Sequence, residues 1–247
     1  MTLKSVQKAY EKVGEEDPLW AILTNNSKRG GKWDPNDFFD SGVKEIDGVM
    51  EYIDTLDIVL KKDNAFDFGC GVGRLTQALC NYFDNVSGMD ISKTMIKNAD
   101  KFNKFGDRCN YITNTEPNLR HFKKDTLDFV YTRIVLQHMA PRYQVEYIKE
   151  FFRVLKPGGI ALFQVRAKKS LNFGFLTDKV YALNNEYWKP FWKKLRSKPS
   201  IQVHTISPEV VEQVIKESGM KLIDVQNIDI RVRKSRKSLR YCVEKPQ

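Results

Sequence analysis

The chain has 247 residues, of which 41% are hydrophobic and 29% are charged, and its formal net charge is +10. No stretch approaches the 18 apolar residues of a membrane span, and the first residues lack the apolar core of a signal peptide, so we expect a soluble, cytoplasmic protein. The four cysteines, at positions 70, 80, 109 and 242, form no Cys-x-x-Cys pair and no zinc spacing. We therefore expect reduced thiols, with neither a metal nor a disulfide.

The first 60 residues are expected to form a helical cap of a single domain. Short helices are predicted over residues 3–13 and 17–24, and Asp17-Pro18 gives the second an N-cap followed by proline. A loop over residues 28–35 then leads to Asp34-Pro35, where a further helix begins that can continue to Leu60.

A strand, a glycine turn and a helix start follow each other between Asn64 and Leu75. The apolar run around Phe66 and Phe68 suits a buried parallel strand, and the glycines at 69, 71 and 73 allow backbone to approach a ligand closely. Apolar residues then recur with helical spacing as far as Phe83. Free N–H groups at the start of this helix would face the turn, which is the geometry of a nucleotide site.

The spacing of the glycines indicates which nucleotide is bound. A dinucleotide fingerprint reads Gly-x-Gly-x-x-Gly, but here the third glycine comes one residue early and Arg74 takes its place. The carboxylate of Asp67 would repel a pyrophosphate, whereas it can attract the ammonium group of an amino-acid cofactor. Asp90 ends the next predicted strand, over residues 86–90, where it can accept hydrogen bonds from the two ribose hydroxyls.

With Asp67-x-Gly-Cys-Gly-x-Gly-Arg74 and Gly88-Met-Asp-Ile-Ser-x-x-Met95, the chain resembles the class I S-adenosylmethionine-dependent methyltransferases over nearly its whole length. The turn Leu155-Lys-Pro-Gly-Gly159 is another feature of this family. The strings Asp17–Thr24, Gly31–Asp34, Phe38-Phe39, Ile134–Met139 and Arg240-Tyr241 are similar to a widespread group of small prokaryotic methyltransferase-domain proteins. The resemblance implies S-adenosylmethionine as the cofactor. The residues assigned to its site are Asp67, Gly69, Cys70, Gly71, Arg74, Asp90, Ile91, Met95, Asn114, Arg133, Lys32 and Trp33.

Several of these assignments have a structural alternative. Met95 can touch the adenine or belong to the core. Asn114, after the predicted strand 110–114, stands where many relatives have Asp, and its amide oxygen can accept the same hydrogen bond from the adenine amino group. Lys32 can pair with the cofactor carboxylate and Trp33 can stack near the sulfonium, or both can simply pack the cap.

The predicted fourth strand, residues 126–132, ends next to Arg133, Gln137 and His138. Ligands of open α/β sheets bind outside the carboxyl ends of the strands, so these residues become the candidates that face the substrate. His138 is the candidate catalytic residue, because it could remove a proton from the acceptor; alternatively it caps the helix that starts near Pro141. No carboxylate cluster accompanies this strand, which disfavours a metal-dependent mechanism.

The rest of the chain completes a Rossmann-like, doubly wound sheet of seven strands. We expect a helix over residues 142–155, a strand over 160–165, a helix from Ser207 to about Ser218, and final strands over 221–228 and 239–244. The sheet is expected to be mostly parallel with an antiparallel C-terminal strand. Residues 61–247 would thus form the methyltransferase domain, with an insertion on the substrate side at about 166–206.

The positive charge is concentrated in two segments. Residues 166–198 contain nine Lys or Arg against two acids, and residues 231–240 contain six and no acid. These segments are either solvated surface or a patch for an anionic partner. We favour methyl transfer to oxygen or nitrogen of a small-molecule or glycan acceptor, which can be anionic. An RNA methyltransferase and a non-catalytic cofactor-binding subunit are the alternatives, although no Asn-Pro-Pro-Tyr string or RNA-binding motif occurs.

Overall fold

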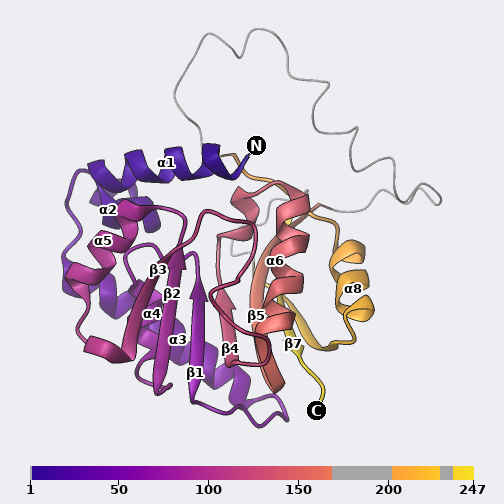
Figure 1. Cartoon of the computed structure of the whole chain (residues 1–247). Helices are drawn as coiled ribbons and strands as arrows, with labels where there is room; N and C mark the ends of the chain where they lie inside the picture. Colours follow the sequence, from indigo (N-terminus) through magenta and orange to yellow (C-terminus); the bar gives the residue numbers. More distant parts are fainter. Residues whose placement is uncertain (1, 169–201, 229–235) are drawn as a thin grey trace, which may run out of the picture.

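The computed structural model describes residues 2–168, 202–228 and 236–247. They form a central sheet between two layers of helices (Figure 1). The elements are α1 (Leu3–Glu16), α2 (Pro18–Ile22), α3 (Pro35–Asp54), β1 (Asn64–Phe68), α4 (Arg74–Leu79), β2 (Asn85–Asp90), α5 (Lys93–Phe102), β3 (Cys109–Thr113), β4 (Leu127–Thr132), α6 (Pro141–Val154), β5 (Leu155–Lys168), α8 (Pro208–Glu217), β6 (Lys221–Asn227) and β7 (Arg236–Glu244), with single 3-10 turns η1 (Asn26–Lys28), η2 (Gly106–Arg108) and η3 (Leu136–His138).

The strands have the order β3-β2-β1-β4-β5-β7-β6. The first five are parallel, and β7 is antiparallel to both of its neighbours. The order reverses between β1 and β4, so a ligand crevice is expected at the carboxyl ends of the central strands. This arrangement confirms the predicted fold class.

Each face of the sheet has its own hydrophobic core. Alternate residues of β1 and β4 point to opposite faces: Phe66 and Val130 pack with α6 and α8, whereas Ala65 and Phe129 pack with α3 and α4. This alternation follows from the period of two in a strand. All four cysteines are buried free thiols.

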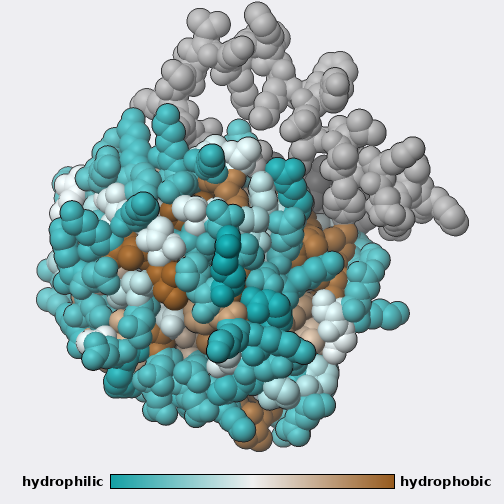
Figure 2. Space-filling model, in the orientation of Figure 1, coloured by the Kyte–Doolittle hydropathy of each residue, from teal (hydrophilic) through white to brown (hydrophobic). Residues whose placement is uncertain are grey.

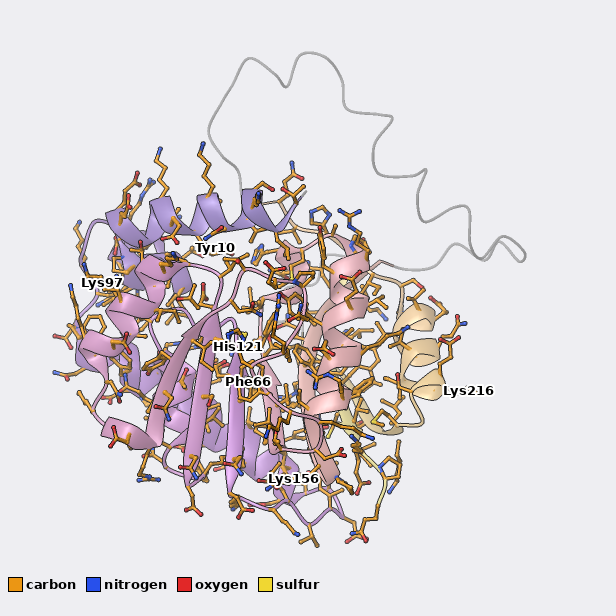
Figure 3. The ribbon with its side chains drawn as sticks, viewed as in Figure 1. Tyr10, Phe66, Lys97, His121, Lys156 and Lys216 are labelled. Atoms are coloured by element: carbon orange, nitrogen blue, oxygen red, sulfur yellow. The ribbon has the colours of Figure 1, made fainter. Side chains whose placement is uncertain are left out.

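The N-terminal helices close one end of the sheet. In Figure 1, α1 crosses above the ends of the strands, and in Figure 3 Tyr10 lies beneath α1 on the side that faces them, while Lys156 lies at the opposite end of the sheet. A small apolar cluster of Leu19, Phe38, Val72 and Met95 joins α2 and α3 to the glycine loop and α5. Of the predicted cap, α1 and α2 therefore lie at the carboxyl ends of the strands, whereas α3 packs on one face of the sheet.

Some predicted boundaries differ from the observed ones. The helix from Pro35 ends at Asp54 rather than near Leu60, because the Ile58 amide turns back to the Leu56 carbonyl at 2.7 Å. Strand β5 begins at Leu155 instead of residue 160, since Leu155 already pairs with Leu127 of β4. Ser207 does not cap α8 with its side chain, because its hydroxyl donates to Glu209 at 2.6 Å.

The two basic segments fall largely outside the described residues. Of the segment 166–198 only residues 166–168 are described, and of the segment 231–240 only residues 236–240. The face shown in Figure 2 is mainly hydrophilic, with apolar residues in the gaps between elements. Among the helices that the structure describes, none is long and apolar enough to cross a membrane.

Candidate functional site

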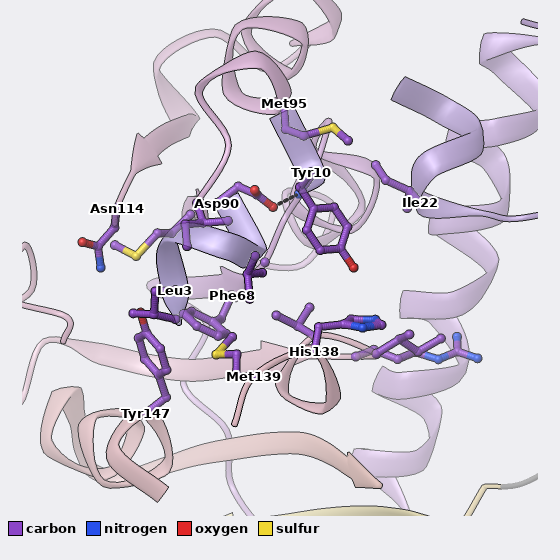
Figure 4. A pocket seen from close by; sticks show the side chains of 18 of the residues that line it. Leu3, Tyr10, Ile22, Phe68, Asp90, Met95, Asn114, His138, Met139 and Tyr147 are labelled. Atoms are coloured by element: carbon purple, nitrogen blue, oxygen red, sulfur yellow. Dashed lines mark hydrogen bonds between the residues drawn. The ribbon is translucent and has the colours of Figure 1, made fainter. Parts of the chain in front are cut away.

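A cavity of about 140 Å³ lies between α1 and the carboxyl ends of the central strands (Figure 4). Eight of the predicted site residues line it: Gly69, Gly71, Asp90, Ile91, Met95, Asn114, Arg133 and His138. The other lining residues come mainly from α1, α2 and the segment after β4, and most of them are apolar: Leu3, Val6, Tyr10, Ala21, Ile22, Phe68, Met89, Ile134, Val135, Met139 and Tyr147. The structure thus brings most of the separate sequence motifs to one place.

The glycine loop presents its backbone to this cavity. The amides of Gly69 and Cys70 both donate to the Met89 carbonyl, at 2.8 and 3.0 Å, which ties the loop to the end of β2. Gly69 and Gly71 have φ angles of 79° and 56°, a region that other residues avoid. A Cβ atom at either position would overlap Val135 or Ile22. Glycine at these two positions leaves room for the Val135 and Ile22 side chains to pack against the loop.

Asp90 is fixed at the centre of the site. Its carboxylate accepts hydrogen bonds from the Gly71 and Ser92 amides, both at 2.9 Å, and the first of these is drawn in Figure 4. Burial raises the pKa of Asp90, while these backbone donors oppose the increase. Each carboxylate oxygen has a further lone pair, so the group can still accept hydrogen bonds from a ligand.

Asp67, Cys70 and Arg74, which we also assigned to the cofactor site, do not line this cavity. Asp67 is 2% exposed and accepts a hydrogen bond from the Thr76 hydroxyl at 2.7 Å. Burial raises its pKa to about 7, although that hydrogen bond and Arg74 oppose the increase. These side chains lie below the glycine loop and support it.

A buried ion cluster links the loop to the segment after β4. Glu45, on α3, pairs with Arg74 at 2.7 Å and with Arg133 at 2.6 Å, and it also accepts a hydrogen bond from the Tyr131 hydroxyl at 3.1 Å. One carboxylate faces two guanidinium groups, so the cluster keeps a net positive charge, and Arg133 carries it to the cavity wall. Burial raises the pKa of Glu45, but the two arginines outweigh that effect and lower it.

Residues that could hold an adenine lie on the β2 and β3 side. Ile91 and Asn114 line the cavity next to Asp90. The Asn114 amide group is already used locally, since its Nδ2 donates to the Asn118 carbonyl at 2.6 Å and its Oδ1 accepts from the Glu116 amide at 3.0 Å. One lone pair of Oδ1 remains for a ligand. Met95 lines the cavity and also belongs to the apolar cluster that joins α2 and α3 to the glycine loop and α5.

The segment after β4 is held in an unusual conformation. Ile134 has a φ of 61°, which a β-branched residue rarely adopts, and its amide donates to the Gln164 side chain of β5 at 3.2 Å. Such a conformation costs of order 1–3 kcal/mol, and it often marks a functional site. Here it turns Val135 and His138 toward the cavity.

His138 does not cap α6, whose N-cap residue is Ala140 and which has no side-chain cap. Its ring lies against the Tyr10 ring, with the centroids 5.9 Å apart in an edge-to-face arrangement. Burial lowers the pKa of His138 from its usual 6.5, so the ring is neutral at neutral pH. A neutral imidazole at a cavity wall can accept a proton.

Lys32 and Trp33 lie away from this cavity. Lys32 is exposed, and the Trp33 indole N–H donates to the Leu23 carbonyl at 3.1 Å while its ring packs edge-to-face on Phe38. The N-terminal contribution to the site comes instead from α1. Tyr10, which lines the cavity from α1, is one of the residues that sequence reasoning missed.

Comparisons with known proteins give a family model that matches the central part of the chain and a curated relative. Residues 66–163 match the family described as a methyltransferase domain. A carboxy-S-adenosyl-L-methionine synthase from Shewanella sediminis is 23% identical over 206 residues, which cover 74% of this chain and 80% of that protein.

Solved structures share the fold. An S-adenosylmethionine-dependent methyltransferase from Leishmania major has a TM-score of 0.64 at 16% identity, covering 96% of this chain and 82% of that one. The magnesium protoporphyrin IX methyltransferase from Synechocystis, with S-adenosylhomocysteine bound, has a TM-score of 0.61 at 17% identity, covering 98% and 99%. The glycine cradle and the fixed Asp90 carboxylate fit the cofactor that these relatives use. Residues 66–163 thus match a methyltransferase domain, and the chain has the fold of S-adenosylmethionine-dependent methyltransferases.

Proposed function

We propose that the protein transfers the methyl group to oxygen or nitrogen of a small-molecule acceptor, either free or as part of a glycan, that binds in the cavity under α1. The single observation that carries this proposal is the cover that α1 provides: Leu3, Val6 and Tyr10 close the carboxyl ends of the strands from above. A nucleic acid would need an open groove at the same place. The Synechocystis neighbour, whose name gives magnesium protoporphyrin IX as its substrate, provides a precedent in the same fold.

In this proposal the cofactor is held by the glycine backbone, Asp90, Ile91, Asn114 and Arg133. The Asp90 carboxylate would hold the ribose, and the glycine loop that it fixes would lie against the amino-acid part. Arg133 would pair with the cofactor carboxylate, because it is the cation among the described residues that line the cavity. When bound, the cofactor supplies a sulfonium-activated methyl group for an in-line displacement.

The protein then contributes mainly position and proton removal. Alignment of the two reactants accounts for most of the rate in such a reaction. His138 would take the proton of a hydroxyl or amine nucleophile as that group attacks the methyl carbon, and its lowered pKa keeps it unprotonated for this step. Tyr10, whose ring touches that of His138, would donate a hydrogen bond to the acceptor.

A binding experiment followed by a product screen tests this proposal. Calorimetry should give heat with S-adenosylmethionine and S-adenosylhomocysteine and none with NAD, and the reverse pattern would overturn the site assignment. The protein should then transfer a labelled methyl group to a component of a cell-metabolite extract, whose product mass identifies the acceptor. Transfer to total RNA, with none to the metabolite fraction, would favour the RNA alternative. Binding without transfer to either pool would favour the non-catalytic subunit.

A further inference from the structure

Helix α1 is tied to the start of α5 by one carboxylate. The Glu11 oxygens accept hydrogen bonds from the Lys93 amide at 2.7 Å, the Thr94 amide at 3.0 Å and the Ser92 hydroxyl at 3.0 Å. The amides at a helix start have no partner within the helix, and a negative charge there interacts favourably with the helix dipole. Burial alone would raise the pKa of Glu11, but the hydrogen bonds from Thr94, Lys93 and Ser92 outweigh it and lower the pKa. Glu11 is therefore a carboxylate bound in a preformed position.

The same turn holds Asp90. The Ser92 amide donates to one oxygen of Asp90 at 2.9 Å, and the Ser92 hydroxyl accepts from the Met95 amide at 3.1 Å while it donates to Glu11. Ser92 is fully buried. Asp90 thus fixes the backbone of Ser92, and Glu11 fixes its side chain. A movement of Glu11 would therefore displace Ser92 and, with it, the Asp90 carboxylate that is proposed to hold the ribose.

The two sides of α1 contact different parts of the molecule. Leu3, Val6 and Tyr10 face the cavity, whereas Glu11 and Gly14 face α5. A Cβ atom at Gly14 would lie 3.2 Å from the Met95 methyl group, so the helices approach closely one turn beyond Glu11. Glu11 and Gly14 are three residues apart and lie on one face of the helix.

We propose that Glu11 is a positioning residue that couples cofactor binding to the docking of α1. Through Ser92 it holds Asp90 in place, and as part of α1 it holds Tyr10 at the wall of the cavity. The inference rests on the proposed cofactor site at Asp90. Two sites that share one rigid element are coupled reciprocally, so the cofactor should stabilise the docked helix as much as the docked helix improves cofactor binding.

The test uses the variant Glu11→Gln, which keeps the shape of the side chain and one acceptor oxygen but removes its charge. We expect its Kd for S-adenosylhomocysteine, measured by calorimetry, to rise about tenfold, since hydrogen bonds to a charged group are the stronger kind. Hydrogen exchange should become faster at the Lys93 and Thr94 amides. In the wild-type protein S-adenosylhomocysteine should slow exchange in residues 3–16, and in the variant this protection should be largely lost.

The matched control is Glu15→Gln, the same change at an exposed position of the same helix. Its Kd should stay within twofold of the wild-type value. If Glu11→Gln does not fold, Glu11→Asp, which keeps the charge but is one methylene shorter, should give a smaller loss of affinity in the same direction. A Glu11→Gln protein with wild-type affinity and faster exchange at Lys93 would overturn the inference, as would an equal effect of the control. Absence of binding by the wild-type protein would overturn the cofactor site itself.

Discussion

Removal of the Asp90 carboxylate is the most direct test of the cofactor site. Among the described residues that line the cavity, Asp90 is the only one with a carboxylate, and it lies between the glycine loop and the start of α5. Asp90→Ala removes this acceptor. A hydrogen bond to a charged group contributes about 1–3 kcal/mol. Because 1.4 kcal/mol corresponds to a tenfold change in Kd, we expect S-adenosylhomocysteine to bind roughly 5–150-fold more weakly.

The substitution also leaves the Gly71 and Ser92 amides without an acceptor, so stability must be measured beside affinity. Each unsatisfied buried donor costs about 1–3 kcal/mol in the free energy of unfolding. The assay is calorimetry at a temperature where thermal unfolding shows the variant to be fully folded, with Asp100→Ala on the exposed face of α5 as the control. A folded Asp90→Ala protein with the wild-type Kd would refute the placement of the ribose at Asp90.

Three further predictions concern proton positions and the acceptor class. Burial raises the pKa of Asp67 from 3.8 to about 7, so the ionisation of this carboxyl group opposes folding as the pH rises between these two values. From about pH 4.5 to 7, the free energy of unfolding of the wild-type protein, measured by urea titration, should therefore fall relative to that of Asp67→Asn. Parallel pH profiles of the two proteins would contradict this prediction. His138→Ala should lower turnover about 10²–10⁴-fold at unchanged cofactor affinity, and the wild-type rate should decline as the pH drops through the lowered pKa of His138; a loss below threefold would make the residue structural. If the acceptor is a small molecule, the rate of methyl transfer should depend only modestly on the salt concentration. The RNA alternative would be favoured by sub-micromolar RNA binding that weakens by orders of magnitude between about 50 and 200 mM salt. Such binding should also be abolished when Arg233, Lys234 and Arg236 are changed to Glu.

The sequence predicts the glycine cradle well because its determinants are local. A buried strand, glycines at fixed spacing and a helix start follow each other within twelve residues, and Asp90 ends the next strand. Local order together with the parallel topology brings the strand ends to one edge of the sheet. Glu45 could not be found in this way, since it lies 29 residues before Arg74 and 88 before Arg133, on a helix with several other acids. Only the packing of α3 on the sheet selects it.

The part of the cavity wall that comes from the N-terminal helices could not be predicted from the sequence, for a different reason. From the sequence, the loop with Lys32 and Trp33 could either close over the cofactor, as the resemblance implies for the N-terminal segment, or pack the cap. Trp33 is held by Leu23 and Phe38, and it serves the cap.

The residues that do reach the cavity, Leu3, Val6 and Tyr10, repeat at the spacing of any helix that packs on a core. A cavity wall and a core face demand the same apolar pattern, so periodicity alone cannot separate them. What separates them is the position of Tyr10, which lines the cavity and whose ring lies against that of His138. This position is known only once the packing of α1 is known, and this is why the helix that closes the site is the part that sequence reasoning assigned to the cap alone.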